Sequence, residues 1–345
     1  MSKMPDSDPA VVAAVENAVT GIEAMALVNA PDAHILGRDA DAPLAMPWRG
    51  WWAAFRRAFW QMLSDRMSLV SAGCAFYATL ALFPAISMLV FLYGLIFDPV
   101  TVAPQLRQLR DLVPPAVFDL IDARVLDLVG RPAGSLGIGL AISTSIALWS
   151  STTGTKAMLL ALNVAYDEDE HRSIITFQLT ALAMTMCATL AAVLTLAALV
   201  VVPILVSFIG LSSYSKILIH TIGLLMLAAT VLVSLAMLYR FGPSRRRAQL
   251  RWVTPGSIIA TILWLGASAL FSFYVGRFAG YDATYGPLAA AIGVMMWFWV
   301  TAYIVLFGAQ LNSQLELQTA CDTTEGASKP MGRRGAFVAD HVAQR

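Results

Sequence analysis

The side chains best suited to binding a polar substrate lie within a long apolar stretch from Ser135 to Tyr166. Eight serines and threonines fall within residues 143–156, and this polar segment ends in Lys156. Polar groups are costly inside a bilayer, and they commonly mark a path for a substrate or an ion. We therefore predict that Lys156, Thr152 and Thr153 line a substrate pathway, in which the lysine binds an anionic group.

The same stretch is too long for one straight span, because 32 residues at the helical rise exceed the thickness of the hydrocarbon core. We predict a break at Gly154. A break exposes backbone groups that transporters use at binding sites, and we expect Asn163 to bond groups freed there. A structural alternative stays open, in which Lys156 reaches the membrane surface and the hydroxyls bond carbonyls of their own or neighbouring helices.

Two further groups of residues complete the predicted site. Tyr285 and Gly286 precede a proline at the start of the last apolar stretch, so we expect a sharp turn there that borders the pathway. A run of three arginines is a candidate contact for anionic lipid headgroups, although a role in membrane orientation explains it equally well. The run consists of Arg245, Arg246 and Arg247.

Other kinds of chemistry lack their sequence signatures. The three cysteines and four histidines are scattered and form no CxxC, HExxH or HxH spacing, so we predict no metal site and no disulfide framework. Neither a GxxxxGK[ST] phosphate loop nor a GxSxG nucleophile motif occurs. We predict that the protein is not an enzyme and uses no cofactor.

Six long apolar stretches must position these residues. Each exceeds the roughly 20 residues that a membrane-spanning helix needs. Apolar residues make up 58% of the chain and charged residues 13%, against about 25% charged residues in soluble domains. The predicted fold class is therefore all-α: a polytopic membrane protein with six transmembrane helices. The stretches cover residues 69–97, 135–166, 174–209, 216–239, 253–278 and 287–317.

The basic residues predict how the spans are oriented. Sixteen lysines and arginines fall before the first stretch, in the second and fourth connections and after the last stretch, whereas six fall in the other connections. Cytoplasmic loops carry the excess of Lys and Arg. We therefore expect both termini in the cytoplasm.

The remaining segments have distinct compositions. We predict a flexible N-terminus over residues 1–47, a membrane domain over 48–317 and a disordered tail over 318–345. Within the membrane domain, residues 98–134 form a long outer loop. Aromatic residues and arginines alternate at helical spacing from Trp48 to Arg66, which predicts an amphipathic helix at the inner membrane interface before the first span.

Taken in order, short motifs across residues 51–317 resemble the YihY/BrkB family of bacterial inner-membrane proteins, once labelled ribonuclease BN. One departure is Gln310, where that family usually carries a glutamate. The motifs are Ala75-Phe76-Tyr77 with Leu82-Phe83-Pro84; Trp149-Ser150, Gly154, Ala161-Leu162-Asn163, Tyr166, Glu168, Glu170 and Arg172; Tyr239-Arg240, Pro243, Trp252 and Pro255-Gly256; and Tyr285-Gly286, Trp297, Gly308-Ala309 and Leu311-Asn312.

The resemblance implies six spans and a role in envelope integrity or transport, including transport of lipid. We expect a transporter or flippase-like protein for an amphipathic or anionic substrate. The alternative is a structural protein that scaffolds the cell envelope through its outer loop. Membrane lipids are the expected partners. We expect no nucleic acid, because the sequence shows no basic groove with stacking aromatics, and a homo-oligomer stays open.

Overall fold

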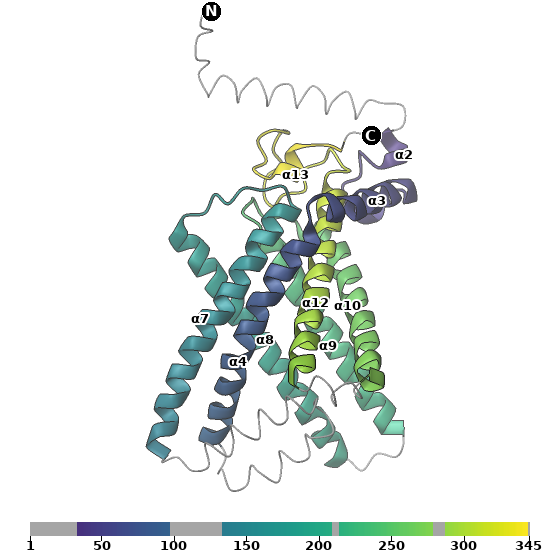
Figure 1. The fold of residues 1–345 in the computed structure, drawn as a ribbon. Coiled ribbons are helices and arrows are strands. Elements are labelled where there is room, and N and C mark those ends of the chain that lie inside the picture. Colours follow the sequence, from purple (N-terminus) through teal and green to yellow (C-terminus); the bar gives the residue numbers. More distant parts are fainter. Residues whose placement is uncertain (1–32, 97–132, 209–213, 279–286, 344–345) are drawn as a thin grey trace, which may run out of the picture.

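The computed structural model describes residues 33–96, 133–208, 214–278 and 287–343, and these residues are mostly helical. Six helices of 28 to 35 residues correspond to the six predicted apolar stretches. They run side by side as a bundle (Figure 1). They are α4 (Met67–Ile96), α7 (Ala133–Ala165), α8 (Ile174–Phe208), α9 (Tyr214–Phe241), α10 (Leu250–Phe278) and α12 (Pro287–Glu316).

Four of these helices have the length and apolar composition to cross a membrane, judged over the described residues. The qualifying segments are Ile174–Ala191, Thr221–Phe241, Leu250–Tyr274 and Ala291–Glu316. The all-α class and the multi-pass membrane character are therefore confirmed. The count of six spans, the inner membrane and the cytoplasmic termini stay predictions.

Small residues allow α10 and α12 to pack closely. A methyl group added at Gly256 would overlap the backbone carbonyl of Gly308 and the side chain of Asn312. The Asn312 amide of α12 joins the two helices by two hydrogen bonds to the backbone of α10. Its Oδ1 accepts from the Gly256 N–H at 2.7 Å, and its Nδ2 donates to the Val253 carbonyl at 2.9 Å. Such small-residue contacts let helix backbones approach within a membrane.

The predicted break at Gly154 does not occur, because α7 continues as one helix from Ala133 to Ala165. A Cβ at Gly154 would lie 3.7 Å from the backbone carbonyl carbon of Tyr77 in α4. This glycine therefore lies at the contact between α4 and α7.

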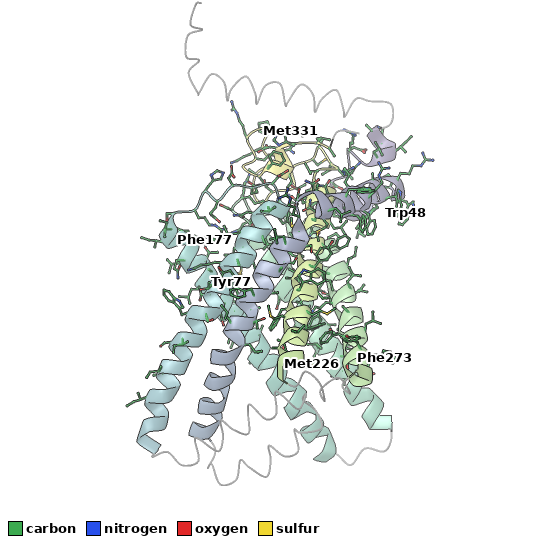
Figure 2. The ribbon with its side chains drawn as sticks, viewed as in Figure 1. Trp48, Tyr77, Phe177, Met226, Phe273 and Met331 are labelled. Atoms are coloured by element: carbon green, nitrogen blue, oxygen red, sulfur yellow. The ribbon has the colours of Figure 1, made fainter. Side chains whose placement is uncertain are left out.

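Helix α3 (Trp48–Ser64) lies across one end of the bundle at a steep angle to the long helices (Figure 1). The face that carries small residues is buried, and Ala54 and Ala58 on it are fully buried. The opposite face exposes large apolar side chains, among them Trp48, Trp52 and Trp60, and Figure 2 shows Trp48 at the far end of the helix, away from the bundle. The predicted amphipathic helix is present, and its place in the membrane interface stays a prediction.

The C-terminal tail differs from the predicted disordered segment. Residues 317–343 fold over the same end of the bundle as α3 and include the short helix α13 (Phe337–Asp340) (Figure 1). Arg334, which is nearly buried, donates to the carbonyls of Ala320, Cys321 and Ala339 at 2.6–3.2 Å. One guanidinium thus gathers several carbonyls, an arrangement that polar composition alone does not reveal.

Part of the predicted flexible N-terminus is also folded. The described part of it contains α2 (Ala33–Leu36) and a 3₁₀ turn at Pro43–Ala45. The Arg38 carbonyl accepts from the Ala320 N–H at 2.8 Å, and Thr319 Oγ1 donates to the Ala40 carbonyl at 2.6 Å. The two terminal segments therefore hold each other against the bundle. Residues 1–32 and the predicted outer loop 98–134, apart from its last two residues, lie outside the described part.

Candidate functional site

Three segments meet at the end of the bundle that the tail covers. They are the α7–α8 connection (166–173), the α9–α10 connection (242–249) and the tail. Asn163 joins the two connections, because its Oδ1 accepts from the Ser244 N–H at 2.8 Å and its Nδ2 donates to Glu170 at 3.0 Å. Asn163 does bond a backbone group, as predicted for a broken helix, but that group belongs to another segment.

A buried ion pair lies beneath these segments. Arg245 donates two hydrogen bonds to the Glu316 carboxylate, at 2.7 and 3.0 Å, and neither side chain is more than 1% exposed. The guanidinium lies over the Tyr166 ring, 4.2 Å from its centroid, and Thr323 Oγ1 donates to Glu316 at 2.7 Å. Arg245 therefore cannot contact a lipid headgroup as predicted: its fork is occupied inside the protein.

Beside the ion pair is a pocket of about 720 Å³ between α8, α9 and the α9–α10 connection. We call it the arginine pocket. Its wall has a basic part and an apolar part. The basic part contains His171, Arg172, Arg240, Arg245, Arg246 and Arg247; the rest contains Thr180, Ala183, Met184, Cys187, Met237, Phe241, Pro243, Ser244 and Gly335.

Three of the five arginines have carboxylate partners. Besides the Arg245 pair, Arg172 donates two hydrogen bonds of 2.8 Å to Glu170, and Arg240 lies 2.9 Å from Glu325. Burial raises the pKa of Glu170, but hydrogen bonds from Arg172 and Asn163 outweigh it and lower that pKa to about 2. Within the described residues, Arg246 and Arg247 form no ion pair.

A second cavity, of about 450 Å³, follows the arginine pocket along the same two helices, and the two cavities share no lining residue. We call it the apolar cavity. On α8 its wall begins at Ala188, next to Cys187 of the arginine pocket; on α9 it includes Ser234 and Leu235, one turn from Met237. Its other lining residues are mostly apolar: Ala191, Thr195, Leu227, Thr230, Val231, Ala260, Trp264, Thr301 and Val305. Together the two cavities offer a cationic end and an apolar continuation.

The predicted pathway residues of α7 lie outside both cavities. Lys156 is half-buried, and no described residue forms a hydrogen bond or ion pair with it. Thr153 Oγ1 donates to the Trp149 carbonyl four residues earlier at 3.1 Å, the intrahelical bond that the structural alternative expected. Thr152 is buried. Tyr285 and Gly286 lie outside the described residues.

Sequence reasoning missed the carboxylates that complete this site. Glu316 follows a long apolar run with no other acid, and this isolation is the signal that could have identified it. Gln310, one turn and a half earlier, is almost fully buried, and its Oε1 has no hydrogen-bond partner within the described structure. Gln310, which stands where the family usually carries a glutamate, thus lies inside the protein and not at the membrane surface.

Glu168 links the pocket region to the tail and is expected to make tail docking pH-dependent. Its carboxylate accepts from the Phe337 N–H at 2.7 Å. Burial raises its pKa from 4.5 to about 7, with Glu316 and Asp340 adding to the rise and Arg245 opposing it. The docked state therefore binds more protons than the undocked state between these values, and docking weakens as the pH rises from about 5 to 8.

Hydrogen exchange of the amides in residues 335–341, corrected for the intrinsic pH dependence, measures this effect. We expect protection to decline across that pH range in the wild type and to stay level in Glu168→Gln. Glu168 lines a small cavity together with His171, Asp340 and His341. His171→Gln and His341→Gln therefore serve as controls, in which protection should still decline as the pH rises. An equal decline in Glu168→Gln would contradict the assignment.

The bundle and the pocket define a multi-pass helical membrane protein with a cationic site at one end. The sequence model of the family described as Virulence factor BrkB matches residues 58–332. The chain therefore belongs to the BrkB family, as its motifs predicted.

Relatives agree with this membership. The chain is 30% identical over 253 residues to the ribonuclease-like protein YfkH of Bacillus subtilis, an alignment that covers 71% of this chain and 88% of YfkH. It is 28% identical to a UPF0761 membrane protein of Alteromonas mediterranea (58% of this chain, 66% of the relative) and 34% identical to one of Idiomarina loihiensis (25% and 30%). The chain thus spans less than two thirds of these last two relatives. No solved structure matches the chain.

Proposed function

We propose that the protein is a transporter or flippase-like protein that moves an anionic amphiphile, and that it catalyses no chemical reaction. One observation carries the proposal: the arginine pocket and the apolar cavity follow one another along the same faces of α8 and α9. A molecule with an anionic group and an apolar body matches both environments at once. Ionised groups require partners when they leave water, and apolar chains require none.

The proposal places the arginine pocket on the cytoplasmic side of the bacterial inner membrane. The terminal segments and the connections 166–173 and 242–249 lie at one end of the bundle (Figure 1). These are the segments that carry most of the basic residues, as the positive-inside rule requires for a cytoplasmic face. The exposed tryptophans of α3 lie at the same end and suit the adjoining lipid interface.

Lipid movement in proteoliposomes tests the function. The wild type is expected to move a fluorescent anionic lipid between leaflets faster than protein-free vesicles. Arg247→Gln should lower this rate about tenfold, because a charge-assisted contact contributes roughly 1.5 kcal/mol or more. Arg251→Gln is the matched control, since it removes the same charge from an exposed side chain that does not line the pocket.

Two other variants separate the earlier alternatives. Loss of movement in Lys156→Met alone would assign the path to the polar face of α7 instead of the arginine pocket. The scaffold alternative depends on residues 98–134, which lie almost wholly outside the described structure. A folded protein that moves no lipid, and whose envelope phenotype depends on those residues, would favour the scaffold over the transporter.

A further inference from the structure

The wall of the arginine pocket includes guanidinium groups whose donors are incompletely satisfied inside the protein. Within the described structure, Arg240 Nε, Arg245 Nε and Arg246 Nη1 are buried and form no hydrogen bond. All three belong to residues that line this one pocket. Buried donors are nearly always satisfied, and each unsatisfied one costs about 1–3 kcal/mol. These nitrogens are closed to solvent, so a ligand in the pocket does not bond them directly; their charge instead adds to the positive potential at the pocket wall, which a bound anion would offset.

The charges around the pocket also specify the ligand. Carboxylates pair with three of the five lining arginines, which leaves Arg246 and Arg247 as two uncompensated positive charges. Arg240 and Arg247 lie over the same Phe241 ring, 5.3 and 4.9 Å from its centroid. Both guanidinium groups raise the positive potential around this ring, and an anion bound in the pocket would offset it.

A phosphate monoester matches the positive charge of the pocket wall. It carries a charge of about −1.5 to −2 near neutral pH and three strong acceptor oxygens, and guanidinium forks match its geometry. A carboxylate or a phosphate diester supplies a single negative charge. From this balance of charge, we infer that the pocket binds the phosphate monoester group of an apolar-tailed molecule. The apolar tail of this ligand rests on the proposed function.

The tail helps to position this site. The Arg246 N–H donates to the Gly335 carbonyl at 2.8 Å, and its Nη2 donates to the Ala327 carbonyl at 3.2 Å. These two contacts hold the Arg246 side chain at the pocket wall, to which Gly335 itself contributes. Binding of the phosphate group and docking of the tail therefore share one arginine.

Equilibrium binding to the full-length protein in nanodiscs of neutral lipid tests the inference. The probes are a phosphatidic acid, a phosphatidylglycerol with the same acyl chains, and inorganic phosphate, at pH 7. We expect the phosphatidic acid to bind at least tenfold more tightly than the phosphatidylglycerol. Inorganic phosphate should compete only weakly if the apolar cavity holds the tail. Competition by inorganic phosphate at equal affinity would instead identify a soluble phosphate ester as the ligand class.

Variants make the assignment specific. Arg247→Gln and Arg246→Gln should each weaken phosphatidic acid binding about tenfold, and Arg251→Gln should leave it unchanged. Arg247 is exposed and bonds the tail only through its backbone carbonyl, which the substitution keeps, so its variant carries the test if Arg246→Gln fails to fold. Equal binding of the two lipids, or wild-type binding by Arg247→Gln, overturns the inference. Movement of lipid without this preference leaves the proposed function standing, whereas preferential binding without movement removes the function and keeps the site.

Discussion

Glu316→Gln is expected to lower the free energy of unfolding by about 3–5 kcal/mol, the largest effect that the structure predicts for a single charge. The substitution leaves Arg245 charged, buried and without its carboxylate, since Glu316 provides both oxygens of the pair. The tail should loosen at the same time, because the Gln amide leaves one acceptor oxygen for both the Arg245 fork and the Thr323 hydroxyl. Thermal unfolding of the detergent-purified protein, followed by its helical circular dichroism, measures the change.

The double variant Arg245→Met/Glu316→Met distinguishes a lost partner from a lost side chain. It removes both charges together, so it should recover more than half of the stability lost in Glu316→Gln. Recovery should be incomplete, because the Thr323 hydroxyl stays buried without an acceptor. Arg251→Met is the control for an exposed ion pair, 3.9 Å long, and should change stability by less than about 1 kcal/mol. A double variant no more stable than Glu316→Gln would contradict a dominant charge effect.

Gly256→Ala is expected to be nearly as disruptive, by a mechanism without charge. The added methyl group would overlap both the Gly308 carbonyl oxygen and the Asn312 side chain of α12. Two backbones would have to separate, and the paired hydrogen bonds of Asn312 to α10 would stretch with them. Overpacking of this kind typically lowers the free energy of unfolding by about 1–3 kcal/mol, and the backbone clash places Gly256→Ala at the upper end.

Gly266→Ala is the matched control for this variant. Gly266 lies in the middle of the same helix, and a Cβ there would meet nothing within 4 Å. Alanine has the better helix propensity by about 1 kcal/mol, so Gly266→Ala should unfold at the same temperature as the wild type or slightly above it. Similar unfolding temperatures for the two alanine variants would show that α10 and α12 tolerate separation.

Both sets of variants act on the frame that holds the arginine pocket. The ion pair joins the α9–α10 connection to the end of α12, and the Asn312 contacts join α10 to α12. Three of the five pocket arginines, Arg245, Arg246 and Arg247, belong to that connection. Variants of the frame should therefore lower stability and ligand binding together, whereas Arg247→Gln should lower binding alone. This contrast separates residues that position the site from those that contact a ligand.

The sequence by itself determined the helices and the family. Long apolar runs are local signals, because a backbone without water must satisfy its hydrogen bonds within its own helix. For the same reason the amphipathic helix from Trp48 was predictable from the spacing of its aromatic residues. Gly154 was a wrong prediction because a glycine inside a helix can mark either a break or a close contact, and only the position of α4 against it decided between them.

Tertiary structure alone decided which polar groups form a site. The arginine run was visible in the sequence, but pairing with Glu316, 71 residues away, buries Arg245, whereas Arg246 and Arg247 keep no carboxylate within the described residues. The tail was predicted to be disordered because polar residues do not form an apolar core. In the folded chain the Arg334 side chain instead bonds carbonyls that lie 13 and 14 residues earlier in the tail. Ion pairs and hydrogen bonds to backbone groups join residues that are far apart in the sequence, so the residues next to each group do not reveal its partner.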